Sequence, residues 1–184
     1  YPLEAVTTMH NIAREAEAAI YHKRLFEELR NLTPKPTDIA HTAAVAAVEA
    51  SINCLASSII VVTSTGRSAQ LMAAYRPRCP VIAVTRDACT ARQLHLYRGI
   101  YPIHYKYKAD PDGKWVEDMD KRINYSIDEG RNLGVIKNGS FVVVVTGWRA
   151  GAGFTNTVRV IRVTESDHPQ ILSSAADLKA TNES

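Results

Sequence analysis

Residues 57–68 read SSIIVVTSTGRS, and this stretch decides the fold. The four apolar residues at 59–62 are all β-branched, which favours a buried strand. The strand stops at a loop of hydroxyl side chains, one glycine and one arginine, and a helical pattern follows at once. Such a loop presents backbone N–H groups, hydroxyl groups and the positive end of a helix dipole at one place. The pattern predicts a phosphate-binding loop; an ordinary strand-to-helix turn capped by Ser and Thr is the alternative.

A second buried strand is predicted at residues 141–146, which read FVVVVT. It runs into GWRAGAGFTNT at 147–157, where three glycines allow the backbone to approach a ligand closely. A glycine-rich hairpin alone is a weak signal. Both unusual loops, however, leave the carboxyl ends of strands, which is where α/β folds bind their ligands.

Alternating strand and helix patterns predict an α/β fold of three layers, with a five-stranded, mostly parallel sheet, one antiparallel edge strand and helices on both faces. Helical spacing predicts one helix over 3–30 and, after a proline-bearing break at 31–36, a second helix that Thr37 caps and that runs to about residue 57. The remaining expected elements are strands at 58–63, 80–85, 99–104, 140–146 and 157–163 and helices at 67–76, 87–97 and 115–133. We expect one domain at 1–163 and a polar, flexible tail at 164–184.

Composition and charge are those of an ordinary globular domain. The 184 residues are 46% hydrophobic and 22% charged with a formal net charge of +3, which suits one domain with a core and does not indicate nucleic-acid binding. No apolar run is long enough for a membrane helix, and the first residues do not have the pattern expected of a signal peptide. Cys54, Cys79 and Cys89 lack metal-type spacing and fit a reduced, cytosolic protein. Because the chain begins at Tyr1 rather than Met, we expect a fragment of a longer protein.

In their order and separation, the two loop motifs resemble the C-terminal domain of eukaryotic pyruvate kinase. Further matching segments lie at 1–6, 12–19, 48–51, 75–78, 83–86, 90–93, 95–100 and 151–157. The resemblance covers residues 1–163. It implies the regulatory domain of a glycolytic, cytoplasmic phosphotransferase that converts phosphoenolpyruvate and ADP to pyruvate and ATP as a homotetramer.

The resemblance also implies a binding site for a sugar-bisphosphate effector, fructose 1,6-bisphosphate or fructose 2,6-bisphosphate. The loop that would hold one phosphate comprises Thr63, Ser64, Thr65, Gly66, Arg67 and Ser68. The resemblance assigns the second phosphate to Trp115 and Arg122. These two residues are seven apart and therefore share one face of a helix. The hairpin residues that would close over the sugar are Trp148, Arg149, Gly151, Ala152, Gly153 and Phe154. A plain surface role for Arg67 and a core role for Trp115 are the alternatives.

The chain departs from the family pattern at a few positions. Many members have proline and serine where Ala150 and Ala152 stand, and Ser64 occupies a position that varies among members. These departures leave the identity and affinity of the effector open. A partial amino-acid effector site is implied for His95, Ile100 and Pro102, with a structural role for the histidine as the alternative.

The family's catalytic lysine and its ligands for Mg²⁺ and K⁺ belong to a barrel domain that this sequence does not contain. We therefore expect the chain to be inactive alone and to hold no metal or cofactor, with its own barrel domain as a partner. One alternative is a purely structural oligomerisation domain with a vestigial pocket. Its subunit interface would be formed by the first helix and the alanine-rich second helix, and Arg14 and Glu49 match a pair across that interface. A self-sufficient small kinase is disfavoured, because no metal-binding carboxylate is expected beside either loop.

Overall fold

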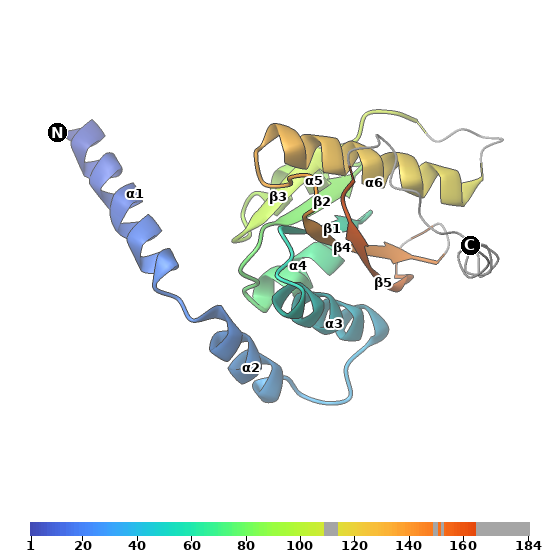
Figure 1. The fold of residues 1–184 in the computed structure, drawn as a ribbon, viewed down its shortest axis with the longest axis horizontal. Helices are drawn as coiled ribbons and strands as arrows, with labels where there is room; N and C mark the ends of the chain where they lie inside the picture. Colours follow the sequence, from blue (N-terminus) through green and yellow to red (C-terminus); the bar gives the residue numbers. More distant parts are fainter. Residues whose placement is uncertain (109–113, 149–150, 152, 165–184) are drawn as a thin grey trace, which may run out of the picture.

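The first predicted strand, β1 (Ser58–Val62), lies at the centre of a five-stranded sheet of order β3-β2-β1-β4-β5 (Figure 1). The other strands are β2 (Val81–Thr85), β3 (Ile100–His104), β4 (Phe141–Gly147) and β5 (Thr155–Arg162). β1 pairs in parallel with both β2 and β4, β2 pairs in parallel with β3, and β4 pairs antiparallel with β5. The computed structural model describes residues 1–108, 114–148, 151 and 153–164.

Helices cover both faces of this sheet. The helices of the described residues are α1 (Pro2–Ala18), α2 (His22–Leu32), α3 (Ile39–Asn53), α4 (Arg67–Ala74), α5 (Ala88–Leu94) and α6 (Trp115–Asn132), and all but α1 pack on the domain. Successive side chains of a strand point to opposite faces, so Ile59 and Val61 join one apolar core with α3 and α4. Ile60 and Val62 join a second core with α6 on the other face. The predicted fold class is therefore confirmed.

The alanines of α3 pack mainly within their own domain. Most of them are buried, Ala44 and Ala47 completely, because α3 packs against β4, β5 and α4 of its own domain. Small side chains let helix and sheet approach closely, and here they do so within one chain. Within the chain, Glu49 accepts hydrogen bonds from Arg30 on α2 at 3.0 and 3.1 Å.

The single helix predicted over 3–30 is wrong, because the chain turns at 19–21 and forms α1 and α2. Phe26 is 2% exposed and packs edge-to-face on Tyr75, which ties α2 to the domain. α1 has no buried residue and extends away from the sheet (Figure 1). The last strand also begins two residues earlier than predicted, since Thr155 still pairs with Gly147.

None of the helices in the described ranges combines the length and apolar character needed to span a bilayer. The expected tail at 164–184 falls outside the described residues from 165 onward.

Gly66 has a left-handed backbone with φ +80°, and a Cβ there would lie 3.0 Å from Leu94 Cδ2. Gly66→Ala should therefore destabilise the domain through both backbone strain and crowding in the core. Gly134 is the matched control, with φ +71° and no atom within 4 Å of the added Cβ. Denaturant unfolding should show about 1–2 kcal/mol lost for Gly134→Ala and at least ~1 kcal/mol more for Gly66→Ala. Equal losses would show that Leu94 yields freely.

Candidate functional site

A cavity of about 1110 Å³ lies at the carboxyl ends of β1, β2 and β4. This is where the strand order reverses, since β1 has its sequence neighbour β2 on one side and β4 on the other. The predicted residues that line the cavity are Thr63, Ser64, Thr65, Arg67, Ser68, Trp115, Arg122, Gly151 and Gly153. The two loops singled out in the sequence therefore meet in one place.

The loop at 63–68 is shaped by its own hydrogen bonds. Thr63 Oγ1 accepts a hydrogen bond from the Gly66 N–H at 2.9 Å, which closes the turn before α4. Ser68 and Thr155 share a hydrogen bond between their hydroxyl groups at 2.8 Å, which joins the loop to β5. Ser64 and Thr65 remain exposed at the cavity. Gly66 is buried and shapes the loop rather than lining the cavity.

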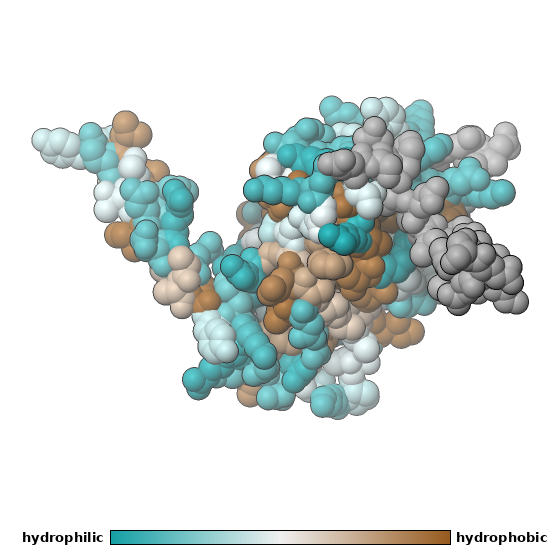
Figure 2. All heavy atoms as spheres, viewed as in Figure 1, coloured by the Kyte–Doolittle hydropathy of each residue, from teal (hydrophilic) through white to brown (hydrophobic). Residues whose placement is uncertain are grey.

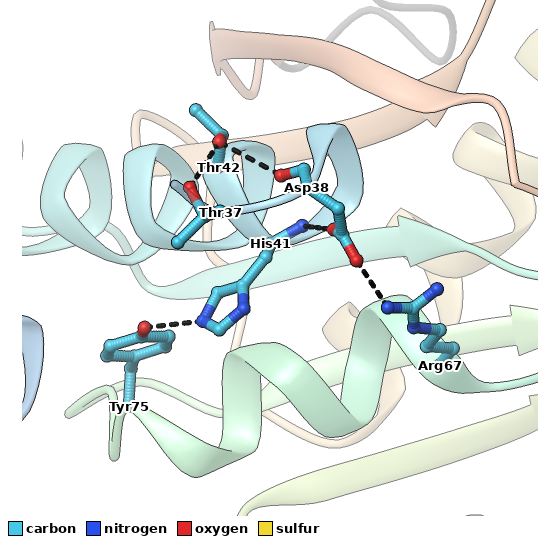
Figure 3. Close-up of polar contacts among 6 residues, drawn as sticks. All are labelled: Thr37, Asp38, His41, Thr42, Arg67 and Tyr75. Atoms are coloured by element: carbon cyan, nitrogen blue, oxygen red, sulfur yellow. Dashed lines mark hydrogen bonds and ion pairs between the residues drawn. The ribbon is translucent and has the colours of Figure 1, made fainter. Parts of the chain in front are cut away.

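Arg67 lines the cavity, where its guanidinium donates to Asp38 Oδ2 (Figure 3). The other carboxylate oxygen of Asp38 accepts from the His41 N–H at 2.7 Å, so Asp38 caps α3. The predicted cap Thr37 is thus wrong by one residue. The His41 N–H, reinforced by the charge of Arg67, holds the pKa of Asp38 below its ordinary value.

Behind this cap, the first turn of α3 is tied to two other helices. His41 Nε2 shares a hydrogen bond with Tyr75 Oη at the end of α4, and Tyr75 Oη shares another with Thr33 Oγ1 at the end of α2, both at 2.6 Å. Figure 3 shows the His41 ring pointing toward Tyr75, away from Arg67. The backbone position of Asp38 is therefore set by packing outside the cavity.

The rest of the cavity has a second arginine cluster, built around Asp118 on α6. The Asp118 carboxylate accepts from Arg86 at 2.5 and 3.0 Å and from Arg122 at 2.5 Å. Arg86 also donates to the Tyr107 carbonyl oxygen at 2.8 Å, and its guanidinium lies over the ring of Tyr105. Trp115 is half-buried: it lines the cavity and also packs against the core under α6.

Sequence reasoning missed Asp38, Arg86 and Asp118. Local signals point to two of these residues: Arg86 directly follows β2, and Asp118 stands one helical turn before Arg122. Three carboxylates line the cavity, those of Asp38, Asp87 and Asp118. Hydrogen bonds from Thr90 hold the pKa of Asp87 below its ordinary value. Across the described ranges, no group of three or more His, Cys, Asp or Glu is arranged to hold a metal ion.

The remaining predicted residues are not among those that line the cavity in the described part of the chain. Trp148 and Phe154 contact each other edge-to-face, with ring centroids 6.2 Å apart. Arg149 and Ala152 are outside the described residues. Of the implied amino-acid half-site, Ile100 is buried in the core with α3 and α4, His95 is exposed after α5, and Pro102 is on β3. None of these three lines the cavity.

The chain is thus an α/β domain whose cavity lies at the switch point of the sheet. Arginines and a hydroxyl-rich loop line this cavity. Residues 41–161 match the family model described as "Pyruvate kinase, alpha/beta domain". The chain is 52% identical over 163 residues to pyruvate kinase PKLR of Rattus norvegicus, covering 89% of this chain and 28% of that protein. It is 43% identical over 162 residues to a pyruvate kinase of Candida albicans, covering 88% of this chain and 32% of that protein. The chain belongs to the pyruvate kinase family.

A third relative agrees with this assignment: pyruvate kinase 2 of Saccharomyces cerevisiae is 42% identical over 163 residues, which are 89% of this chain and 32% of that protein. The chain thus spans only about a third of the length of these curated relatives. The resemblance identified from the sequence is confirmed.

Removing the Asp118 carboxylate should destabilise the domain, because Arg86 and Arg122 would lose their shared partner. The side chains of Asp118 and Arg122 are only 19% and 14% exposed. We expect Asp118→Ala to cost about 1.5–3 kcal/mol of unfolding free energy. The control on the same helix is Asp128→Ala, which breaks an exposed pair with Arg131 and should cost less than about 1 kcal/mol. Denaturant unfolding of both variants measures the difference, and equal costs would refute the bridging role.

Proposed function

We propose that this chain is the regulatory domain of a pyruvate kinase and that its cavity binds a sugar bisphosphate, fructose 1,6-bisphosphate or fructose 2,6-bisphosphate. One observation carries the proposal: two separate arginine groups and a hydroxyl-rich loop line one cavity. Arginine forms forked, charge-assisted hydrogen bonds with phosphate, and hydroxyl and backbone N–H groups add donors without adding charge. A ligand with two phosphates can use both arginine groups at once.

The loop at 63–68 would hold one phosphate. Its exposed donors are the hydroxyls of Ser64 and Thr65 and the guanidinium of Arg67. The turn closed by Thr63 and Gly66 presets the loop, so little conformational entropy is lost when a ligand is bound.

The second phosphate would lie beside α6. Arg86 and Arg122 together carry two positive charges against the single negative charge of Asp118, so this cluster has a net attraction for anions. Arg122 Nε is buried and has no hydrogen-bond partner among the described residues. Trp115, seven residues before Arg122, lines the same cavity and offers an indole N–H.

For the longer protein, we propose the activity that the names of the relatives state, that of a pyruvate kinase. It would transfer a phosphoryl group from phosphoenolpyruvate to ADP in the cytoplasm, with Mg²⁺ and K⁺ held by a catalytic barrel outside this sequence. The bisphosphate would act by coupling, so that its binding tightens phosphoenolpyruvate binding by about 5- to 150-fold.

Calorimetric titration of the chain with fructose 1,6-bisphosphate tests the binding proposal. Arg122→Ala should weaken binding by roughly ten- to 150-fold, since a charge-assisted hydrogen bond contributes about 1.5–3 kcal/mol. Asp118 keeps Arg86 as a partner in this variant, so the fold should persist. Thr65→Ala removes a neutral donor worth about 1 kcal/mol and should weaken binding less.

Arg24→Ala is the matched control, because Arg24 forms an exposed pair with Glu28 on α2 and does not line the cavity. Its affinity should equal that of the parent chain. In a Trp148→Phe background, Trp115 is the remaining tryptophan, and its fluorescence should report binding. Absence of any binding at millimolar ligand would refute the effector site in this chain.

A second candidate role is contact between copies of this chain through α1. Leu3, Val6, Met9 and Ile12 recur every three residues along α1 and are 63–75% exposed. Figure 2 shows apolar side chains along this helix, which extends away from the body of the domain. Burial of such a row against another copy would remove apolar surface from water. Because the alanines of α3 are buried in their own domain, α1 is the helix that supports the oligomer proposal.

Val6→Asp should reduce self-association of the chain, because a charge placed in this row would be buried at the contact. Sedimentation equilibrium over a range of concentrations measures the effect. Asn11→Asp adds the same charge to the same helix outside the apolar row and should leave association unchanged. A chain that stays monomeric throughout, or two variants with equal effects, would contradict a role for α1 in association.

A further inference from the structure

Arg67, in the loop at 63–68, already has a carboxylate as its partner. Its guanidinium donates to Asp38 Oδ2, and both residues line the cavity (Figure 3). The two residues are 29 positions apart, so this pairing is a product of the fold. The inference that follows rests on the proposed sugar-bisphosphate site.

The Asp38 carboxylate is held in place by α3. Its Oδ1 accepts from the His41 N–H at 2.7 Å, and its own carbonyl oxygen accepts from the N–H and the hydroxyl of Thr42, both at 2.9 Å. Thr42 is held in turn by the hydroxyl of Thr37 at 2.8 Å. If Arg67 turns toward a ligand, the carboxylate of Asp38 therefore stays with the helix and cannot follow.

Arg67, by contrast, is free to exchange partners at low cost. Its side chain is 63% exposed and that of Asp38 is 47% exposed, and exposed ion pairs contribute little to stability because water screens them. Phosphate is the stronger partner for arginine, since it offers several charged oxygens to the planar guanidinium. The lowered pKa of Asp38 means that its carboxylate is charged at neutral pH.

We propose that Asp38 sets the affinity of the loop site: it competes with the ligand phosphate for Arg67 and stays in place as a negative charge beside it. Binding then replaces one ion pair with another, so the net gain is smaller than a fresh arginine–phosphate contact would supply. The Asp118 cluster differs, because Asp118 shares two arginines and is less exposed. Asp38 thus limits affinity at one end of the bisphosphate only.

Asp38→Asn separates the two roles of this residue. Asparagine caps a helix about as well as aspartate, so α3 should be retained, while the charge that competes for Arg67 is removed. Titration with fructose 1,6-bisphosphate should show binding about three- to tenfold tighter than in the parent chain, from the lost competition and the lost repulsion. Asp128→Asn removes the same charge from an exposed arginine pair that does not line the cavity, and its affinity should be unchanged.

A double-mutant cycle with Arg67→Gln tests whether the effect passes through Arg67. In the Arg67→Gln background, Asp38→Asn should give a clearly smaller gain in affinity than in the parent chain, because only the charge repulsion is left to relieve and no guanidinium is left to compete for. An equal gain in both backgrounds would show simple charge repulsion and would overturn the competition. Asp38→Ser, which also preserves a cap, replaces the asparagine variant if the latter is unstable in thermal melts.

The outcomes separate this inference from the function on which it rests. Tighter binding by Asp38→Asn, including binding that only this variant shows, supports the competition. Binding at equal or lower affinity than the parent chain overturns it and leaves the bisphosphate site intact. Absence of binding by the parent chain and the variant overturns both.

Discussion

Burial of β1 on both faces is the constraint on which the rest of the structure depends. Ile59 and Ile60 have no solvent exposure although they point to opposite faces. A parallel strand of this kind is stable only when helices cover both sides of the sheet. Pairing with β2 and β4 then fixes where β1 ends. The loop after Val62 is therefore delivered to the same edge as Gly147, and the cavity forms there.

The cavity is lined by charges of both signs, and this balance shapes what it can bind. Arg67 is paired with Asp38, and Arg86 and Arg122 share Asp118. An anion must therefore compete with carboxylates that the fold has already placed. The exposed pair exchanges easily, while the cluster on α6 is more enclosed, so the two ends of a bisphosphate would meet sites of different rigidity.

The alanine-rich surface of α3 could pack either against another subunit or against the sheet of its own domain. A smooth, small-residue helix can pack against another subunit or against its own sheet, and the same periodicity serves both. Here Ala44 and Ala47 are completely buried within the domain. The fold leaves exposed instead the row of large apolar side chains on α1. The periodicity of this row is no clearer than that of the alanines on α3. Periodicity shows that a face is apolar, but not which surface covers it.

Local patterns in the sequence determined the five strands, the parallel core of the sheet and the loop at 63–68, because β-branched runs and hydroxyl-rich turns act through near neighbours. They also placed Trp115 and Arg122 on one helical face. Only the tertiary structure decided that the chain turns at 19–21, that Asp38 meets Arg67 and that Asp118 joins Arg86 to Arg122. The charge pairs that Arg67 and Arg86 form link residues about thirty positions apart. No periodic signal spans that separation, since such pairs arise only when the sheet brings the ends of its strands to one edge.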